Sequence, residues 1–130
     1  MGRPLRGYPC GVSVRAYSEL RVWRVSRALV VESYRIARLL PPQERYGLGG
    51  QIRRAAASVP ANVAEGFGRL HRGDCVRFLS IARGSLMELR SHLDVAAALG
   101  LVSEGELRRA SELSDYTGRM LTRMIRRLQE

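Results

Sequence analysis

Apolar residues recur at every third or fourth position along most of the chain, which is the spacing of one face of an α-helix. Four segments carry this pattern, at residues 18–40, 48–69, 75–99 and 103–128, and glycine or proline interrupts the chain between them. No segment alternates apolar and polar residues as a half-buried strand does. Because the linkers are short, successive helices should run antiparallel. The pattern predicts an all-α protein, an antiparallel up-down four-helix bundle.

The same spacing selects the residues that should form the core. In the first helix we expect a buried face made of Val22, Val25, Leu29, Ile36 and Leu39. The corresponding face of the second helix contains Ile52, Ala56, Val59, Val63 and Phe67. In the third helix it contains Phe78, Ala82, Leu86, Leu89, Leu93 and Ala96.

Signals at the helix ends support these limits. Pro41 pushes the residue before it out of the helical region and so ends the first helix. Asp74 is the expected N-cap of the third helix, and Gly100 is its C-cap glycine. Ser103 and Glu106 have the spacing of a capping box, in which each side chain binds the other residue's backbone amide at a helix start.

Residues 58–69, with the sequence SVPANVAEGFGR, are the most unusual part of the second helix. Pro60 lies inside the helix, where proline removes a backbone hydrogen bond and costs about 3 kcal/mol or more. Such a cost is tolerated only where the surrounding packing requires it, so we expect this helix at the centre of the architecture. A row of small residues beside the buried face would let another backbone approach closely: Ala57, Pro60, Ala64 and Gly68.

Gly84 interrupts the third helix, where glycine costs about 1 kcal/mol relative to alanine. We expect close contact between Gly84 and the small-residue row of the second helix to compensate for this cost. The second helix also carries a polar row: Gln51, Ser58, Asn62, Glu65 and Arg69. The row is either a polar seam between helices or subunits, in which Glu65 accepts from an arginine, or a ligand site, and we favour the seam. Ser58 and Asn62 can occupy the carbonyl that Pro60 leaves unpaired.

Composition adds a strong positive charge. The 130 residues carry 22 basic side chains, all of them arginine, against 12 acids, which gives a net charge of +10. Arginine presents a planar fork of donors that matches phosphate and so favours a polyanionic partner, although codon bias also produces an arginine-only composition. Residues 1–16 contain no acid. We expect them to form a flexible basic N-terminal arm before a bundle of residues 17–130.

The candidate nucleic-acid-binding residues are arginines that share a helix face. One row on the first helix lacks an acidic neighbour on its own face: Arg21, Arg24, Arg35 and Arg38. Such a row repels itself, and a phosphate-rich partner would explain it. Three more candidates stand near the end of the fourth helix: Arg123, Arg126 and Arg127. The helix dipole is an alternative explanation there, since acids gather at the start of that helix and bases at its end.

The sequence contains no catalytic motif such as HExxH, a P-loop or GxSxG. Glu88 and His92 stand one helical turn apart and are more simply an exposed acid–imidazole contact than a metal pair. Cys10 and Cys75 lack the spacing of a metal site or a disulfide framework and fit a reducing cytosol. We therefore expect a protein that is not an enzyme and has no metal or cofactor. Because no apolar run is long enough for a membrane span or a signal sequence, we expect it in the cytoplasm.

Several segments together resemble a known family. They are QIRRAAASVPANVAEGFGR at 51–69, RFLSIARGSLMEL at 77–89, LRVWRVSRALVV at 20–31 and PPQERYGLGGQIRRA at 41–55. These segments are similar to the four-helix-bundle proteins called 23S rRNA-intervening-sequence proteins, and the similarity covers about residues 18–128. The chain departs from the family in its arginine-rich arm, in His71 and Arg72 of a loop, and in the density of arginine throughout.

The resemblance implies an up-down four-helix bundle that assembles as a homopentameric barrel. It also implies kinship with the accessory variability determinant of diversity-generating retroelements, a basic barrel that binds a reverse transcriptase and nucleic acid. On this resemblance, a structural motif or subunit contact would be formed by Ser58, Pro60, Asn62, Glu65, Gly66, Arg69 and Gly84.

Three hypotheses remain open at this point. The first is a non-enzymatic, basic, oligomeric module that binds nucleic acid, RNA before DNA, through many phosphate contacts and without sequence preference. The second is an adaptor protein that binds the reverse transcriptase of a diversity-generating retroelement. The third is a purely structural oligomer whose charge is incidental.

Overall fold

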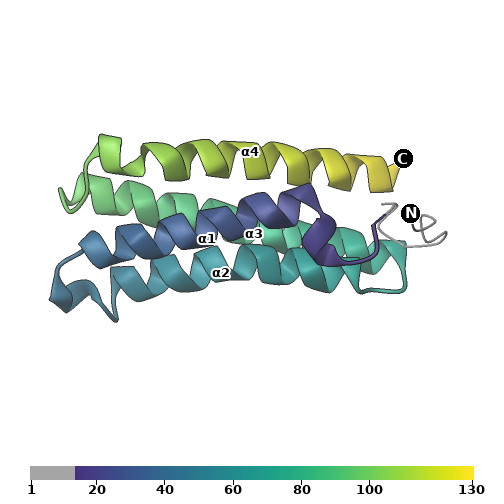
Figure 1. Cartoon of the computed structure of the whole chain (residues 1–130), viewed down its shortest axis with the longest axis horizontal. Coiled ribbons are helices and arrows are strands. Elements are labelled where there is room, and N and C mark those ends of the chain that lie inside the picture. Colours follow the sequence, from purple (N-terminus) through teal and green to yellow (C-terminus); the bar gives the residue numbers. More distant parts are fainter. Residues whose placement is uncertain (1–13) are drawn as a thin grey trace.

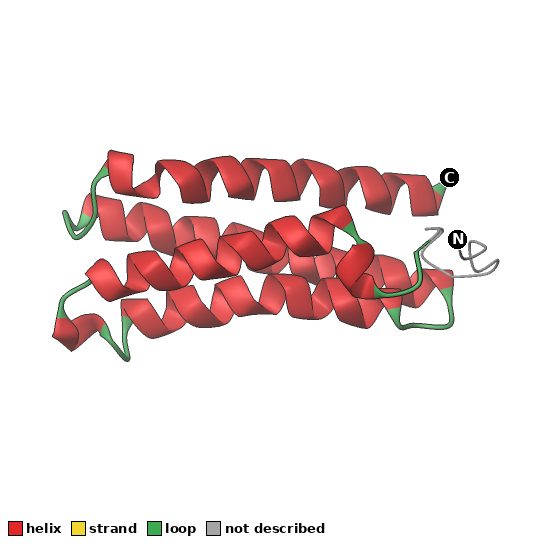
Figure 2. Cartoon of the chain, in the orientation of Figure 1, coloured by secondary structure: helices red, strands yellow, loops and turns green. Residues whose placement is uncertain are grey.

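The computed structural model of the chain describes residues 14–130, so residues 1–13 of the predicted basic arm lie outside the described residues. Four long helices make up most of the described chain: α1 (Arg21–Leu39), α2 (Leu48–Phe67), α3 (Arg72–Ala98) and α4 (Glu104–Gln129). Short 3-10 helices, η1 (Tyr17–Glu19) and η2 (Pro42–Glu44), precede α1 and α2. No strand occurs within residues 14–130 (Figure 2). The all-α prediction is confirmed.

The four long helices lie side by side and run in alternating directions (Figure 1). Each packs on the next helix in chain order, and α4 closes the arrangement by packing on α1 as well as on α3. The α1–α2 and α3–α4 turns lie at one end of the bundle, and the α2–α3 turn and the C-terminus lie at the other. None of these helices has the length and apolar character needed to cross a membrane.

The core runs along the centre of the bundle and draws on all four helices. Side chains with no exposed area include Leu29, Ile36, Ile52, Val59, Val63, Leu86, Leu89 and Leu121. Burying a side chain of this size contributes about 1.5–3 kcal/mol. The predicted apolar face of the second helix is buried throughout, from Ile52 to Phe67. Periodicity therefore identified correctly the face of α2 that lies against the rest of the bundle.

The predicted face of α1 is partly wrong. Leu39 is 42% exposed, whereas Ser26 and Ser33 are fully buried and Glu32 is nearly so. The reason is that α1 packs against both α2 and α4, so its buried surface is wider than one apolar stripe and includes small polar positions. A buried hydroxyl needs a hydrogen-bond partner. Ser26 finds one within its own helix, since its hydroxyl donates to the Trp23 carbonyl at 2.8 Å.

Helix α2 continues through Pro60, and its polar row forms a seam with α3. The Ser58 and Ser85 hydroxyl oxygens lie 2.8 Å apart, and Asn62 Nδ2 donates to the Ser58 hydroxyl at 2.9 Å. Asn62 also donates to the Ser58 carbonyl at 2.8 Å. The prediction of a seam is confirmed for these residues. The predicted carbonyl was wrong: Pro60 frees the carbonyl of Ala56, whereas Asn62 reaches the carbonyl four residues before itself.

The expected close contact at Gly84 is wrong. Gly84 is exposed, and a Cβ built there would meet no atom within 4 Å. It lies on the outer side of α3, away from the small residues of α2. The close approach of the two helices occurs at Gly66, where a Cβ would lie 3.2 Å from Phe78 Cβ and 3.3 Å from the Cys75 carbonyl oxygen.

Three of the four predicted helix-end signals are confirmed. The residue before Pro41 is extended, and α1 ends at Leu39. Gly100 follows the C-cap of α3 with a φ of 72°, and the Ser103–Glu106 capping box is complete. Asp74 is not the N-cap of α3, because the helix already begins at Arg72 and His71 occupies the cap position. Asp74 instead lies in the first turn, where its charge still complements the helix dipole.

Candidate nucleic-acid interface

An open groove of about 610 Å³ runs between helices α3 and α4, where the two helices pack together. Most of its charged lining is guanidinium, contributed by both helices: Arg83, Arg90, Arg119, Arg123, Arg126 and Arg127. Among the described residues that line it, Asp115 and Glu130 are the acids. The groove is therefore strongly electropositive and suited to an anion.

The spacing of the arginines places them on facing sides of the groove. On α4, Arg119, Arg123 and Arg127 follow one another at intervals of four residues, which keeps them on one face of the helix. Arg83 and Arg90 stand two helical turns apart on α3 and so share a face as well. Gly118 lets the helices approach here, because a Cβ at this position would lie 3.3 Å from Leu86 Cδ2.

The two α3 arginines are held in place by α4. Arg90 Nη2 lies 2.7 Å from Asp115 Oδ1, and Arg83 Nε donates to the Thr122 hydroxyl at 3.0 Å. Within residues 14–130, the four α4 arginines of the groove form no ion pair. The groove continues into a smaller hollow of about 310 Å³ that shares Arg83, Thr122 and Arg126 with it. The α4 guanidiniums are thus available to an external anion, while the α3 side is fixed.

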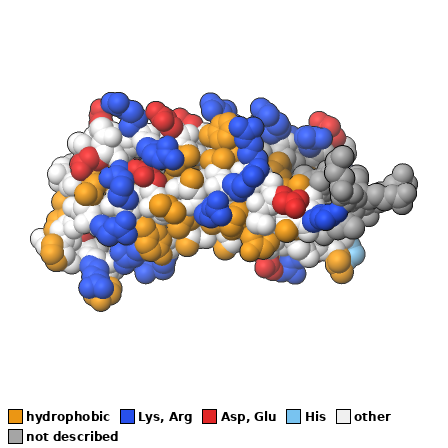
Figure 3. Space-filling view, in the orientation of Figure 1, with side chains coloured by type: hydrophobic (Ala, Val, Ile, Leu, Met, Phe, Trp, Pro, Cys, Tyr) orange, Lys and Arg blue, Asp and Glu red, His pale blue; other side chains and the backbone are white. Residues whose placement is uncertain are grey.

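The predicted arginines of α1 lie apart from this groove and differ among themselves. Arg24 and Arg38 are exposed. The Arg21 guanidinium lies 5.3 Å from the ring centre of Tyr116 on α4, in a cation–π contact. Figure 3 shows one face of the bundle, on which basic side chains are spread over much of the length and acidic ones stand singly between them. Of the seven predicted arginines, only Arg123, Arg126 and Arg127 line the α3–α4 groove.

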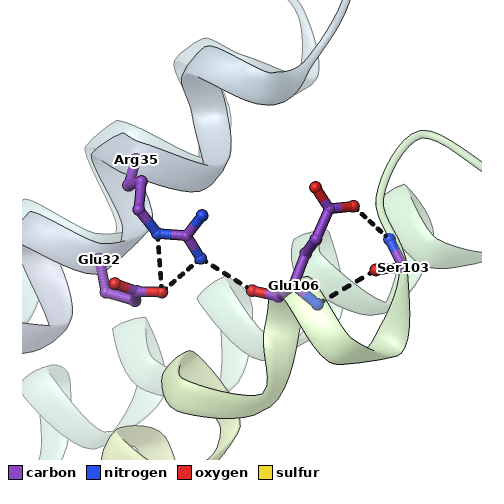
Figure 4. A network of polar contacts seen from close by, with 4 residues as sticks. All are labelled: Glu32, Arg35, Ser103 and Glu106. Carbon is purple, nitrogen blue, oxygen red and sulfur yellow. Dashed lines mark hydrogen bonds and ion pairs between the residues drawn. The ribbon is translucent and has the colours of Figure 1, made fainter.

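Arg35 corrects the expectation that this row has no acidic neighbour. Its Nη2 lies 2.6 Å from Glu32 Oε1 and also donates to the Glu106 carbonyl at 2.9 Å (Figure 4). The hydrogen bond to Glu32 raises the pKa of Arg35 above its ordinary value. Glu32 stands three residues earlier on the same helix, so the row does have an acidic neighbour. Arg35 therefore joins α1 to α4 and is engaged within the protein.

The other predicted motif residues lie where α2 meets α3. Glu65 on α2 forms an ion pair with Arg69 in the turn that follows, as expected for a carboxylate that accepts from an arginine. The Arg69 guanidinium also lies 4.5 Å from the ring centre of Phe78 on α3. With Gly66 and the serine seam, these residues hold the two helices together. Their part in contacts between subunits stays a prediction.

Three groove residues were not among the predicted arginines: Arg83, Arg90 and Arg119. Arg119 could have been found from its position one turn before Arg123. The signal for Arg83 and Arg90 was weaker. Their separation of seven residues places them on one face of α3, but it does not show which helix packs beside that face. Their importance follows from the packing of α3 on α4.

The described residues provide little for metal chemistry. No group of three or more His, Cys, Asp or Glu side chains within residues 14–130 is placed to hold a metal ion. His92 Nε2 lies 3.3 Å from Glu88 Oε1, which is the contact expected from their spacing. The Cys75 thiol is free and buried. The chemistry that the arrangement supports best is the binding of phosphate-like anions.

A family model described as 23S rRNA-intervening sequence protein matches residues 18–123, which include all of α1, α2 and α3 and most of α4. The chain belongs to this family. The resemblance noted in the sequence is therefore confirmed over nearly the whole described part. A search of curated proteins found no match.

Proposed function

We propose that this member of the 23S rRNA-intervening sequence protein family is a non-enzymatic, oligomeric protein that binds nucleic acid, with RNA as the first candidate. The observation that carries the proposal is the arginine-lined groove between α3 and α4. The family's name contains 23S rRNA and states no ligand, so RNA is the polyanion to test first. Among the described lining residues there is no histidine or cysteine, and the Thr122 hydroxyl accepts from Arg83, so the lining suits binding better than catalysis.

The geometry of α4 fits the repeat of a phosphate backbone. Arg119 and Arg127 are eight residues apart, a rise of about 12 Å along the helix. For comparison, the phosphates of one strand of B-DNA are about 3.4 Å apart along the helix axis, so this length spans about three to four such intervals. Guanidinium groups bind phosphate oxygens in a bidentate manner, and the pairs Arg83–Thr122 and Arg90–Asp115 limit how far the α3 side can move.

Binding of this kind should not depend on the base sequence, because the arginines of the groove would contact phosphates. It should depend strongly on salt. For a single strand, contact with four phosphates gives a slope of log K against log salt concentration of about −3. Oligomerisation would repeat the groove in each subunit, and weak contacts would then add through multivalency.

The decisive experiment compares two charge-reversal variants of α4. Arg123→Glu/Arg126→Glu changes the groove, whereas Arg108→Glu/Arg109→Glu changes two exposed arginines of the same helix outside it. Both variants alter the net charge equally. After nuclease treatment, affinity for a labelled single-stranded RNA would be measured by fluorescence anisotropy across a salt series, with circular dichroism to confirm folding.

We expect the groove variant to bind RNA at least tenfold more weakly and with a shallower salt slope, and the matched control to bind close to the unmodified protein. Equal losses in the two variants would mean that net charge alone attracts RNA. If the unmodified protein fails to bind at any salt concentration, the proposed function is wrong and a purely structural oligomer is the better description. Light scattering on the same samples measures the subunit number.

A further inference from the structure

A second pocket, of about 670 Å³, lies at the turn between α1 and α2. Its lining includes three arginines, Arg38, Arg45 and Arg53, and one aromatic residue, Tyr46. The others are apolar: Ala37, Leu40, Pro41 and Pro42. No acid is among the described residues that line it. The pocket thus combines an aromatic ring, three positive charges and an apolar floor.

Tyr46 is the most conspicuous part of this pocket, because 83% of its surface is exposed. An exposed apolar residue is common on a protein surface and needs no explanation by itself. Here the ring lines the same pocket as three arginines, and the Arg45 guanidinium lies 5.5 Å from the ring centre. Flat aromatic rings beside arginines are the combination on which unpaired nucleobases stack while their phosphates are neutralised.

The turn that carries Tyr46 is held in place from both sides. The Glu44 carboxylate accepts a hydrogen bond from the Leu48 amide at 3.1 Å and so binds a backbone amide in the first turn of α2. Gly49 lets η2 lie against α2, since a Cβ there would come within 2.9 Å of the Glu44 carbonyl oxygen. Arg53 Nη2 donates to the Arg45 carbonyl at 2.8 Å, which orients Arg53 and leaves its other nitrogens for a ligand. The backbone of the turn and the Arg53 side chain are therefore held in place by the protein itself.

We propose that this pocket binds an unpaired nucleotide of a single-stranded RNA, with the base stacked on Tyr46 and its flanking phosphates held by Arg38, Arg45 and Arg53. This inference rests on the proposed function and specifies which form of nucleic acid the protein prefers. A phosphate-bearing ligand is the occupant that this lining favours, because it presents three guanidiniums and no acid to neutralise them.

The pocket and the α3–α4 groove can be tested separately. The pocket lies at the end of the bundle that holds the α1–α2 turn, and the groove lies in the half nearer the C-terminus (Figure 1). Because the groove binds phosphates and the pocket also binds a base, single strands should be favoured over duplexes only as long as Tyr46 is present.

The test measures anisotropy of a labelled RNA oligonucleotide in single-stranded form and as a duplex of equal length, at one salt concentration. Tyr46→Ala removes the ring, Tyr46→Phe keeps it, and Tyr34→Ala removes another exposed tyrosine that lies outside the pocket. We expect Tyr46→Ala to weaken single-strand binding about 5- to 100-fold and to leave duplex binding unchanged. Tyr46→Phe and Tyr34→Ala should retain the preference for the single strand.

A second readout reports stacking directly. An oligonucleotide with a 2-aminopurine base should lose fluorescence when saturated with the unmodified protein or with the groove variant, and should not do so with Tyr46→Ala. Equal weakening of single strand and duplex by Tyr46→Ala, or unchanged quenching, would overturn the inference while leaving the proposed function standing. A change of oligomeric mass in Tyr46→Ala would overturn it by making the pocket a subunit contact. Absence of binding to both RNAs by the unmodified protein would overturn both proposals.

Discussion

Arg35 of α1 reaches across the bundle to Glu106 of α4, where its Nη2 donates to the main-chain carbonyl at 2.9 Å. The same guanidinium is bound to Glu32, whose carboxylate is nearly buried at the α1–α4 contact. Glu106 is also the second member of the capping box that starts α4 (Figure 4). One arginine therefore connects a buried acid to the first turn of the last helix.

Removing this arginine should destabilise the protein. In Arg35→Gln, Glu32 keeps its burial and loses its charged partner, which is costly because a buried carboxylate without a partner is poorly solvated. We expect a lower Tm in thermal unfolding followed by circular dichroism, and partial recovery in Glu32→Gln/Arg35→Gln. Arg24→Gln, an exposed position on the same helix, should leave the Tm unchanged. If Arg35→Gln and Arg24→Gln have equal Tm values, the contact contributes nothing.

The pH range of this contribution follows from the direction of the pKa shift. The pKa of Arg35 is raised above its ordinary value, chiefly by the hydrogen bond to Glu32, so folding favours the protonated guanidinium. Stability from this group is fully present below the ordinary arginine pKa and would be lost only as the pH rises through the raised value. Titration of Arg35 should therefore cause no loss of stability between neutral and moderately alkaline pH.

Two glycines on adjacent helices should respond in opposite ways to alanine. At Gly66 a Cβ meets α3 within 3.3 Å, including a backbone carbonyl that cannot turn away, so Gly66→Ala should destabilise by about 1–3 kcal/mol. At Gly84 the space is open, so Gly84→Ala should stabilise by about 0.5–1 kcal/mol. Urea unfolding of the two variants measures both effects. The packing described for α2 on α3 would be contradicted if both substitutions stabilised.

These glycines also show how far the sequence could predict the structure. Helical spacing, the capping box and Gly100 are local signals, and they predicted all four helices and the apolar face of α2. Which glycine touches a neighbouring helix depends on how α2 and α3 are rotated against each other, and each helix alone contains no such information. The small-residue row predicted a close approach at the wrong place on both helices, because Gly66, where α2 meets α3, is not part of that row and Gly84 is exposed.

The candidate site was predictable to a similar extent. Arg123, Arg126 and Arg127 were found because four basic residues crowd the end of the last helix. Arg83 and Arg90 become part of the groove only because α3 packs beside α4. Arg35 was misjudged for the same reason, since the buried surface of α1 faces two helices and brings Glu32 inward. Charge predicted the kind of ligand, and tertiary packing decided which arginines are available to it.

The serine seam offers a test of how α2 and α3 are joined. The Ser58 and Ser85 hydroxyls form one hydrogen bond across the helices, so Ser58→Ala and Ser85→Ala should each destabilise by about 0.5–1.5 kcal/mol. Because either substitution breaks the same bond, the double variant should cost less than the sum of the single ones. A double-mutant cycle in urea measures the coupling. Strict additivity would show that the two hydroxyls do not stabilise each other.

Asp115 provides the sharpest test of the groove, since its removal should improve binding. Its carboxylate lines the groove and pairs with Arg90, so Asp115→Asn removes a charge that repels phosphate and frees a guanidinium that can bind it. The pair is partly exposed, with side chains 39% and 53% accessible, and its loss should lower stability by less than about 1 kcal/mol.

Glu112→Gln is the matched control for Asp115→Asn, because it makes the same change in net charge at an exposed α4 position outside the groove. We expect Asp115→Asn to bind single-stranded RNA about two- to fivefold more tightly at low salt, and Glu112→Gln to differ little from the unmodified protein. The advantage should fade as salt rises, because a contact with phosphate is screened like any other exposed charge pair. Equal gains in affinity in the two variants would mean that RNA responds to the net charge of the bundle and does not bind preferentially in the groove between α3 and α4.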